Sequence, residues 1–261
     1  MLRLELAPQA KGKLNPDKRY HEMKDLLALA LESHGGQARW DEIRTVTAEL
    51  TIGGALWDLK GKTGALQDAR YEADVHVQRA TLARFTAPDR RVRFTRDRLV
   101  LETDAGAVIE TRDNPRSAFI GHSRESSWDD LHVAYFSGYA MWTYLTQPFL
   151  YAYQGFEARE IEPWEEAGEI WRRLEVIFPA YIASHTRRQV SYFGSDGLIR
   201  RHDYEVDVLG GSTAAQYISS YREFGGIVTP TRRRVYALGP NNRPIPEPIL
   251  VSIDVKSARF D

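Results

Sequence analysis

The stretch WDDLHVAYFSGYAMWTYLTQPFLYAY, residues 128–153, is the segment that decides how this chain folds. Five of its residues recur at spacings of three or four positions, so on a helix they form one stripe: Trp128, His132, Tyr135, Tyr139 and Trp142. An ordinary buried stripe consists of Leu, Ile and Val, whereas these side chains join an apolar body to a polar group that needs a partner. The segment therefore predicts a helix that lines a cavity for a bulky lipophilic or aromatic molecule.

Around this segment the sequence alternates between apolar and polar residues, which is typical of β-strands. A strand is expected after Ile43, with a bend at Gly53-Gly54, and further strands at about 66–77, 79–86, 90–95, 98–103 and 107–112. After Asn114-Pro115 we expect a helical or looped insert to about 157, and then strands at about 169–178, 187–193, 198–208, 213–223, 227–238 and 249–256. The connections are short, which predicts antiparallel pairing of successive strands.

An opening helix is expected from Asn15-Pro16-Asp17, a cap followed by proline, to Gly35-Gly36. The acidic run from Glu157 to Glu169 indicates a surface connection. We predict a single ligand-binding domain over residues 1–261 that is mainly β with α, of the α+β class. Its single large curved antiparallel sheet would form a half or open β-barrel, with helices on the concave face and a helical plug insert at about 114–157.

Composition excludes several classes of function. The net charge of −1 provides no positive field for nucleic acid, and the arginine clusters, such as Arg232 to Arg234, alternate with apolar residues as on the outer faces of strands. The chain has no cysteine, which excludes disulfides, thiolate nucleophiles and zinc–cysteine sites. His76 lies on one strand face with Asp74 and Glu72, a pattern that fits a solvated face better than a metal site. We therefore expect neither metal nor cofactor.

The N-terminal residues MLRLELAPQAKGKLNPDKRYHEM contain no continuous apolar stretch of the length that a signal peptide needs. The aromatic segment is short and contains Pro148 and many polar atoms, so stable membrane insertion is not expected. These features predict a cytoplasmic protein, or a periplasmic one if a leader has been removed.

The stretch LLALALESHGGQARW, residues 26–40, is followed by the strand pattern from Ile43 to Ile52 and by a long series of strands interrupted by helices. This order resembles the LolA/LppX-type lipoprotein-carrier superfamily over most of the chain. In that superfamily an unclosed barrel holds an apolar cavity, plugged by helices, that receives acyl chains. The resemblance implies that the aromatic stripe occupies the position of the plug.

The strand LIRRHDYEVDV, residues 198–208, contains the main polar candidates. Alternation places Arg200, His202 and Tyr204 on the same face as Leu198, Val206 and Val208, and the acidic residues on the other face. Polar groups that converge on an apolar wall can orient a ligand, and His202 could act as a general base. The alternative is that His202 and Tyr204 only hydrogen-bond one another or the backbone beneath the helices.

Two functions remain open from the sequence. The first is binding of a lipophilic or aromatic small molecule, for which the candidate residues are Trp128, Tyr135, Tyr139, Trp142, Tyr217 and Tyr221. The alternative is a cofactor-independent cyclase, isomerase, lyase or hydrolase in the same cavity, with His202, Tyr204, Arg200 and His132 as catalytic candidates. His185 is expected at a strand mouth or on the surface, and His132 has the simpler alternative of a core histidine bonded to a neighbour.

Overall fold

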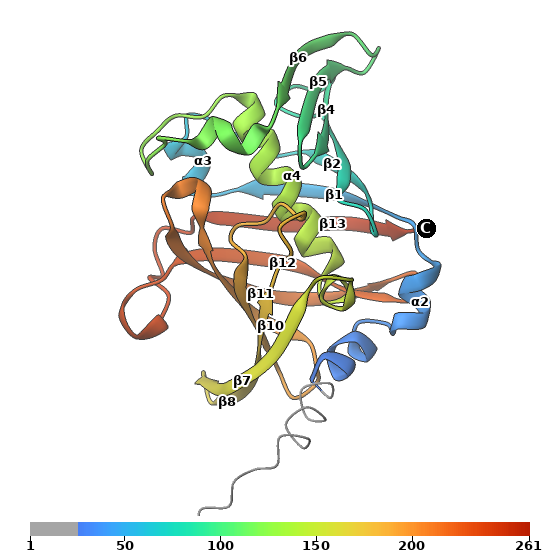
Figure 1. Cartoon of the computed structure of the whole chain (residues 1–261), viewed down its shortest axis with the longest axis vertical. Coiled ribbons are helices and arrows are strands. Elements are labelled where there is room, and N and C mark those ends of the chain that lie inside the picture. Colours follow the sequence, from blue (N-terminus) through green and yellow to red (C-terminus); the bar gives the residue numbers. More distant parts are fainter. Residues whose placement is uncertain (1–25) are drawn as a thin grey trace, which may run out of the picture.

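A computed structural model describes residues 26–261 of the chain (Figure 1). Residues 26–33 are helical and lead to Gly35 and Gly36, as expected, whereas the expected start of this helix at Asn15-Pro16-Asp17 lies outside the described residues. Among the described residues no helix is long and apolar enough to cross a membrane.

The described residues form one antiparallel sheet of thirteen strands, in the order β6-β5-β4-β3-β2-β1-β13-β12-β11-β10-β9-β8-β7. The first wing consists of β1 Thr45–Gly53, β2 Ala69–Asp74, β3 Arg79–Ala83, β4 Arg90–Thr95, β5 Arg98–Thr103 and β6 Val108–Asp113. The second consists of β7 Glu157–Glu166, β8 Glu169–Ile177, β9 Arg188–Phe193, β10 Ile199–Val206, β11 Ser212–Phe224, β12 Ile227–Ala237 and β13 Val251–Phe260. Because β6 and β7 are the two edges, the sheet is not closed, which confirms the predicted open half-barrel that is mainly β with some helix.

The two wings meet where β1 pairs with β13, shown in blue and red in Figure 1. β1 alternates between buried and half-buried residues along its whole length. The buried set, Val46, Ala48, Leu50 and Ile52, faces the core, as period-two alternation requires.

Helix α4, Asp130–Thr146, crosses the concave side of the sheet (Figure 1). It begins with a capping box, in which the Asp129 side chain accepts a hydrogen bond from the His132 backbone N–H, and it ends before Gln147-Pro148. Every residue from 131 to 146 is buried. The helix is therefore enclosed on all sides, not buried along a single stripe, because the two wings wrap around it.

The shorter helices flank α4 or join strands. They are α2 Gln37–Glu42, α3 Ala55–Leu59 and the single-turn 3₁₀ helices η1 Pro115–Phe119, η2 Phe149–Ala152, η3 Asp207–Leu209 and η4 Pro240–Asn242.

Two parts of the fold differ from the sequence prediction. The acidic run expected as a surface connection contains the edge strand β7, which pairs with β8 and reaches solvent along most of its length. The expected bend at Gly53-Gly54 is instead the end of β1 and the start of α3. Gly54 has φ of 113°, and a Cβ there would lie 2.6 Å from the carbonyl oxygen of Leu250, so this junction requires glycine.

Candidate functional site

A cavity lies between α4 and the second wing of the sheet. A water molecule can enter about 70 Å³ of it, and the space between the lining atoms amounts to about 610 Å³ when the open solvent at its mouth is included. Helix α4 contributes Phe136, Ser137, Ala140, Met141 and Tyr144 to its wall. The remaining wall comes from strands and connections and is mostly apolar: Ile52, Leu56, Trp57, His185, Tyr204, Val206, Leu209, Ser212, Thr213, Ala214, Val235, Leu250, Val251 and Ile253.

The cavity has an open end and a closed end. Ser212 and Thr213 are exposed and Leu250 is half-buried, so the mouth lies near the start of β11 and β13. Tyr204, Ala214 and Val235 lie deeper in the wall, and all three are buried.

One step further along the same faces of β10, β11 and β12 come His202, Gln216 and Arg233. His202 pairs directly with Gln216 in the sheet, and these three side chains are at most 2% exposed. The closed end of the cavity is therefore backed by a polar row.

Hydrogen bonds join α4 to this end of the sheet. The hydroxyl of Tyr144 lies 2.7 Å from Nε2 of His185 and 2.8 Å from the hydroxyl of Tyr204. The hydroxyl of Tyr139 lies 3.2 Å from the other ring nitrogen of His185, Nδ1. The rings of His185 and Tyr204 stack with centroids 4.1 Å apart. His185 is thus fully enclosed and holds three aromatic side chains in place, contrary to the expected mouth or surface position.

Gln147, just after α4, connects His202 of the polar row to Tyr151 and, through Tyr151, to Ser191 on β9. Its Nε2 lies 3.1 Å from Nδ1 of His202 and donates a hydrogen bond to the Tyr151 hydroxyl at 2.8 Å. The Tyr151 hydroxyl in turn lies 2.6 Å from Oγ of Ser191.

Arg233 is the charged member of the polar row. It donates hydrogen bonds to Oε1 of Gln216 at 2.6 Å, to the Tyr144 carbonyl at 2.6 Å and to Oε1 of Gln147 at 3.5 Å. Its guanidinium also lies over the Tyr144 ring, 4.9 Å from the centroid. Within residues 26–261 it forms no salt bridge, so this buried cation has only neutral partners.

Burial sets the protonation of this region. It lowers the pKa of His185 to about 3 and lowers that of His202 well below its usual value, with nearby positive charges acting in the same direction. Burial also raises the pKa of Tyr144 to about 12, although the bond with Tyr204 opposes it. Both histidines and the tyrosine are therefore neutral near pH 7.

These shifts predict acid sensitivity of the fold. Burial also lowers the pKa of His34 to about 4. In the folded chain His34, His185 and His202 therefore stay neutral at pH values just below 6.5, where the same histidines of the unfolded chain become protonated. The contribution of these histidines to the free energy of unfolding is fully present above pH 6.5. It decreases as the pH falls below 6.5, by up to about 1.4 kcal/mol per pH unit for each histidine. Urea unfolding at several pH values above 5 measures this slope, and His185→Asn should reduce it by about one proton. A flat profile in this range would contradict the prediction.

The predicted aromatic stripe does not line the cavity. Trp142 donates a hydrogen bond to the Asp74 carbonyl at 2.8 Å, Tyr135 packs near Phe94, and Trp128 packs against Trp57. Only Tyr139 reaches the site, through His185. The neighbouring face of α4 lines the cavity instead, because all faces of this helix are covered and the stripe is turned toward the first wing and η1.

His132 serves the start of α4. Its Nδ1 lies 2.7 Å from Oδ1 of Asp129, and its Nε2 lies 3.1 Å from the Ala118 carbonyl. This agrees with the simpler alternative of a histidine bonded to its neighbours.

Tyr204 lines the cavity and His202 lies directly behind it, but Arg200 is not brought to either. Its guanidinium pairs with Asp196 at 2.7 Å. The register between β9 and β10 shifts between Ile199 and Arg201, and this irregularity removes Arg200 from the alternation of the strand. Tyr221 lies outside the cavity wall too, and its hydroxyl bonds the Ile199 carbonyl.

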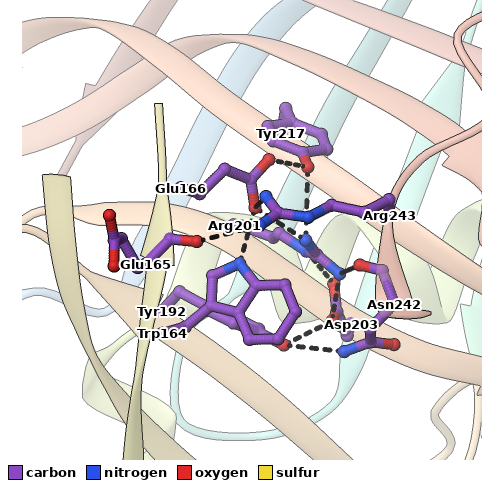
Figure 2. A network of polar contacts seen from close by, with 9 residues as sticks. All are labelled: Trp164, Glu165, Glu166, Tyr192, Arg201, Asp203, Tyr217, Asn242 and Arg243. Atoms are coloured by element: carbon purple, nitrogen blue, oxygen red, sulfur yellow. Dashed lines mark hydrogen bonds and ion pairs between the residues drawn. The ribbon is translucent and has the colours of Figure 1, made fainter. Parts of the chain in front are cut away.

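The outer face of β10 carries a second polar cluster, which includes Tyr217 (Figure 2). Arg201 bonds both carboxylate oxygens of Asp203, at 2.6 and 2.8 Å, and Oε2 of Glu166 at 2.9 Å. The rings of Tyr192 and Tyr217 flank its guanidinium, at 4.9 and 5.5 Å. Tyr217 therefore belongs to this cluster and not to the cavity.

Gln147, Gln216 and Arg233 were not among the predicted site residues. The alternation of β12 could have predicted that Arg233 is buried, because it lies on the same strand face as Ile227, Thr229 and Val235, which are all buried. Its two arginine neighbours masked this pattern. Gln147 had no such signal, because its position depends on where α4 ends.

No metal-binding group of three or more His, Asp or Glu residues occurs in the described part of the chain. In the turn that was considered as a metal site, Asp74 Oδ1 accepts the backbone N–H groups of His76 and Val77, and His76 Nε2 lies 2.9 Å from the Ile43 carbonyl.

Comparisons with known proteins identify the fold. A domain named for outer membrane lipoprotein sorting, from Vibrio parahaemolyticus, is 12% identical, with a TM-score of 0.50 over 90% of this chain and 92% of that one. A LolA superfamily protein from Nitrosomonas europaea is 10% identical, with a TM-score of 0.49 over 92% and 93%. A DUF1329 family protein from Desulfovibrio piger is 16% identical, with a TM-score of 0.49 over 92% and 93%.

No protein-family model matches the sequence, and no curated protein matches it either. At these identities the likeness concerns the fold alone. The LolA/LppX-like architecture predicted from the sequence is confirmed.

Proposed function

We propose that this chain acts as a single ligand-binding domain that holds a lipophilic or aromatic small molecule in the cavity beside α4. The observation that carries the proposal is the cavity itself, whose wall is mostly apolar and includes His185, Tyr144 and Tyr204, which contact one another through hydrogen bonds. Pockets for small molecules have this composition, in which apolar walls supply contact area and a few polar groups orient the ligand. The fold supports the proposal, because the Vibrio domain of the same architecture is named for lipoprotein sorting.

The protonation of the site favours binding over catalysis. A general base works best with a pKa near the operating pH, whereas burial lowers the pKa of His185 to about 3 and that of His202 well below its usual value. Neutral histidines that already hold tyrosine or glutamine partners suit a fixed wall better than a proton-transfer group.

The cytoplasmic location expected from the N-terminal residues gains no support from the fold, since the Vibrio domain is named for the outer membrane. A periplasmic site of action fits the proposed function. Fractionation of the source cells, with an antibody against this chain, tests this part of the proposal.

The binding proposal is tested with the neutral fluorescent probe N-phenyl-1-naphthylamine. After removal of any co-purified molecule, detected by native mass spectrometry, we expect saturable binding of one probe per chain and displacement by dodecanol. Ile170→Ser is the matched control, because Ile170 is a large apolar side chain with 69% exposure on β8, away from the cavity wall. Probe binding that does not saturate, or that is lost in Ile170→Ser, would reject the cavity as the site.

A further inference from the structure

Arg233 and its neighbours present hydrogen-bond donors without a matching negative charge. Gln216 uses its Oε1 for Arg233, and its buried Nε2 approaches the Tyr144 hydroxyl without reaching the geometry of a hydrogen bond. An arginine has five N–H donors, and the described residues accept three hydrogen bonds from Arg233. Burying a charge with only neutral partners is costly, and so is burying an unpaired amide.

These donors lie directly behind the cavity wall. The Gln216 amide is close enough to the Tyr144 hydroxyl to influence its pKa, and the Arg233 guanidinium lies over the Tyr144 ring. Tyr144 itself lines the cavity. Gln216 lies two residues after Ala214 on β11, and Arg233 lies two residues before Val235 on the antiparallel β12, so both lie on the side of these wall residues away from the mouth.

Resting on the proposed function, we propose that the ligand is an amphiphile with a carboxylate, which binds at Tyr144, Gln216 and Arg233 while its apolar body fills the cavity. One carboxylate balances the single charge of Arg233 and accepts hydrogen bonds from the Tyr144 hydroxyl and the neighbouring Gln216 amide. The apolar body then extends past Ala140 and Met141 toward the mouth.

Arg233 also contacts the end of α4, and this contact explains part of its position. The Tyr144 carbonyl belongs to the last turn of α4, where carbonyls lack helical partners and the helix dipole is negative. Arg233 therefore also stabilises the end of α4. A role limited to this contact predicts no preference for acidic ligands and leaves the unpaired Gln216 amide unexplained.

The test compares dodecanoate with dodecanol as competitors of the neutral probe. We expect dodecanoate to bind at least about tenfold more tightly, the effect of a hydrogen bond to a charged group. Arg233→Met should remove this preference. Arg234→Met is the matched control, because Arg234 is the next residue on β12 and pairs with Asp254 at 2.8 Å on the other face.

Gln216→Glu provides an independent variant in case Arg233→Met does not fold. It places a carboxylate where Gln216 Oε1 already accepts from Arg233, so we expect a higher melting temperature and loss of the preference for dodecanoate. Equal binding of dodecanoate and dodecanol to the wild-type protein would overturn the inference but leave the proposed function intact. Failure of both to displace the probe would reject the proposed function.

Dodecyl phosphate, acetate and inorganic phosphate distinguish the sources of the anion. We expect acetate and inorganic phosphate not to displace the probe, because most of the contact area belongs to the apolar body. Dodecyl phosphate should bind more weakly than dodecanoate, since its second charge has no partner in the polar row. A clear preference for dodecyl phosphate would overturn the choice of a carboxylate.

Discussion

Replacing Arg201 with methionine is expected to lower the free energy of unfolding by about 3–5 kcal/mol, the effect of removing one partner of a buried ion pair. Arg201 has no exposed surface, and the side chains of Asp203 and Glu166 are only 10% and 12% exposed. Methionine fills the space between the flanking aromatic rings but leaves the Asp203 carboxylate without a cation, while Glu166 keeps only the Arg243 guanidinium at 3.6 Å (Figure 2).

Arg200→Met is the control for this substitution. It changes the same residue type one position earlier on β10, and its pair with the half-exposed Asp196 should contribute at most about 1 kcal/mol. Urea unfolding of both variants at one pH measures the difference. A loss in Arg201→Met of at most about 1 kcal/mol, as small as that expected for Arg200→Met, would show that the outer cluster contributes little to the stability of the fold.

Ala140→Phe is expected to abolish binding of the neutral probe. Ala140 is the smallest side chain that α4 contributes to the cavity wall, and it lies between Phe136 and Tyr144 on the helix. An aromatic ring at this position occupies the space that the ligand needs, so we expect a loss of affinity of at least about a hundredfold, nearly 3 kcal/mol.

The control here is Ala140→Ser, which changes the volume little and should bind the probe as the wild-type protein does. Because Ala140 is enclosed, the larger residue also strains the packing, at a typical cost of about 1–3 kcal/mol. The melting temperatures of both variants separate this strain from the loss of binding. Undiminished binding by folded Ala140→Phe would place the ligand elsewhere.

The architecture could be predicted because each strand has a strong local pattern. The bounds of β4 and β5 agree with the sequence prediction, since tight turns separate these alternating segments. β7 could not be predicted in this way. It is an edge strand with polar residues on both faces, so it lacks the alternation that identifies a half-buried strand.

The site was predicted less completely, for two physical reasons. The aromatic residues of α4 surround the helix, so a stripe chosen by spacing does not show which face a cavity touches. In β10 the irregularity near Ile199 removes Arg200 from the expected inner face, whereas Arg201 keeps its place on the outer face, and a register shift leaves no mark in a single sequence. Tyr204 and His202 were placed on the inner face because they lie beyond this irregularity.

The seam between β1 and β13 sets an order in which the sheet can be completed. During synthesis, β1 to β6 can pair with one another early, but the free edge of β1 waits for β13, the last strand of the sheet in chain order. An unpaired strand edge readily accepts a strand from another molecule. Exchange of β13 between two nascent chains would satisfy the same hydrogen bonds and join them as a swapped dimer, so the late strand is the point at which folding and misassembly compete.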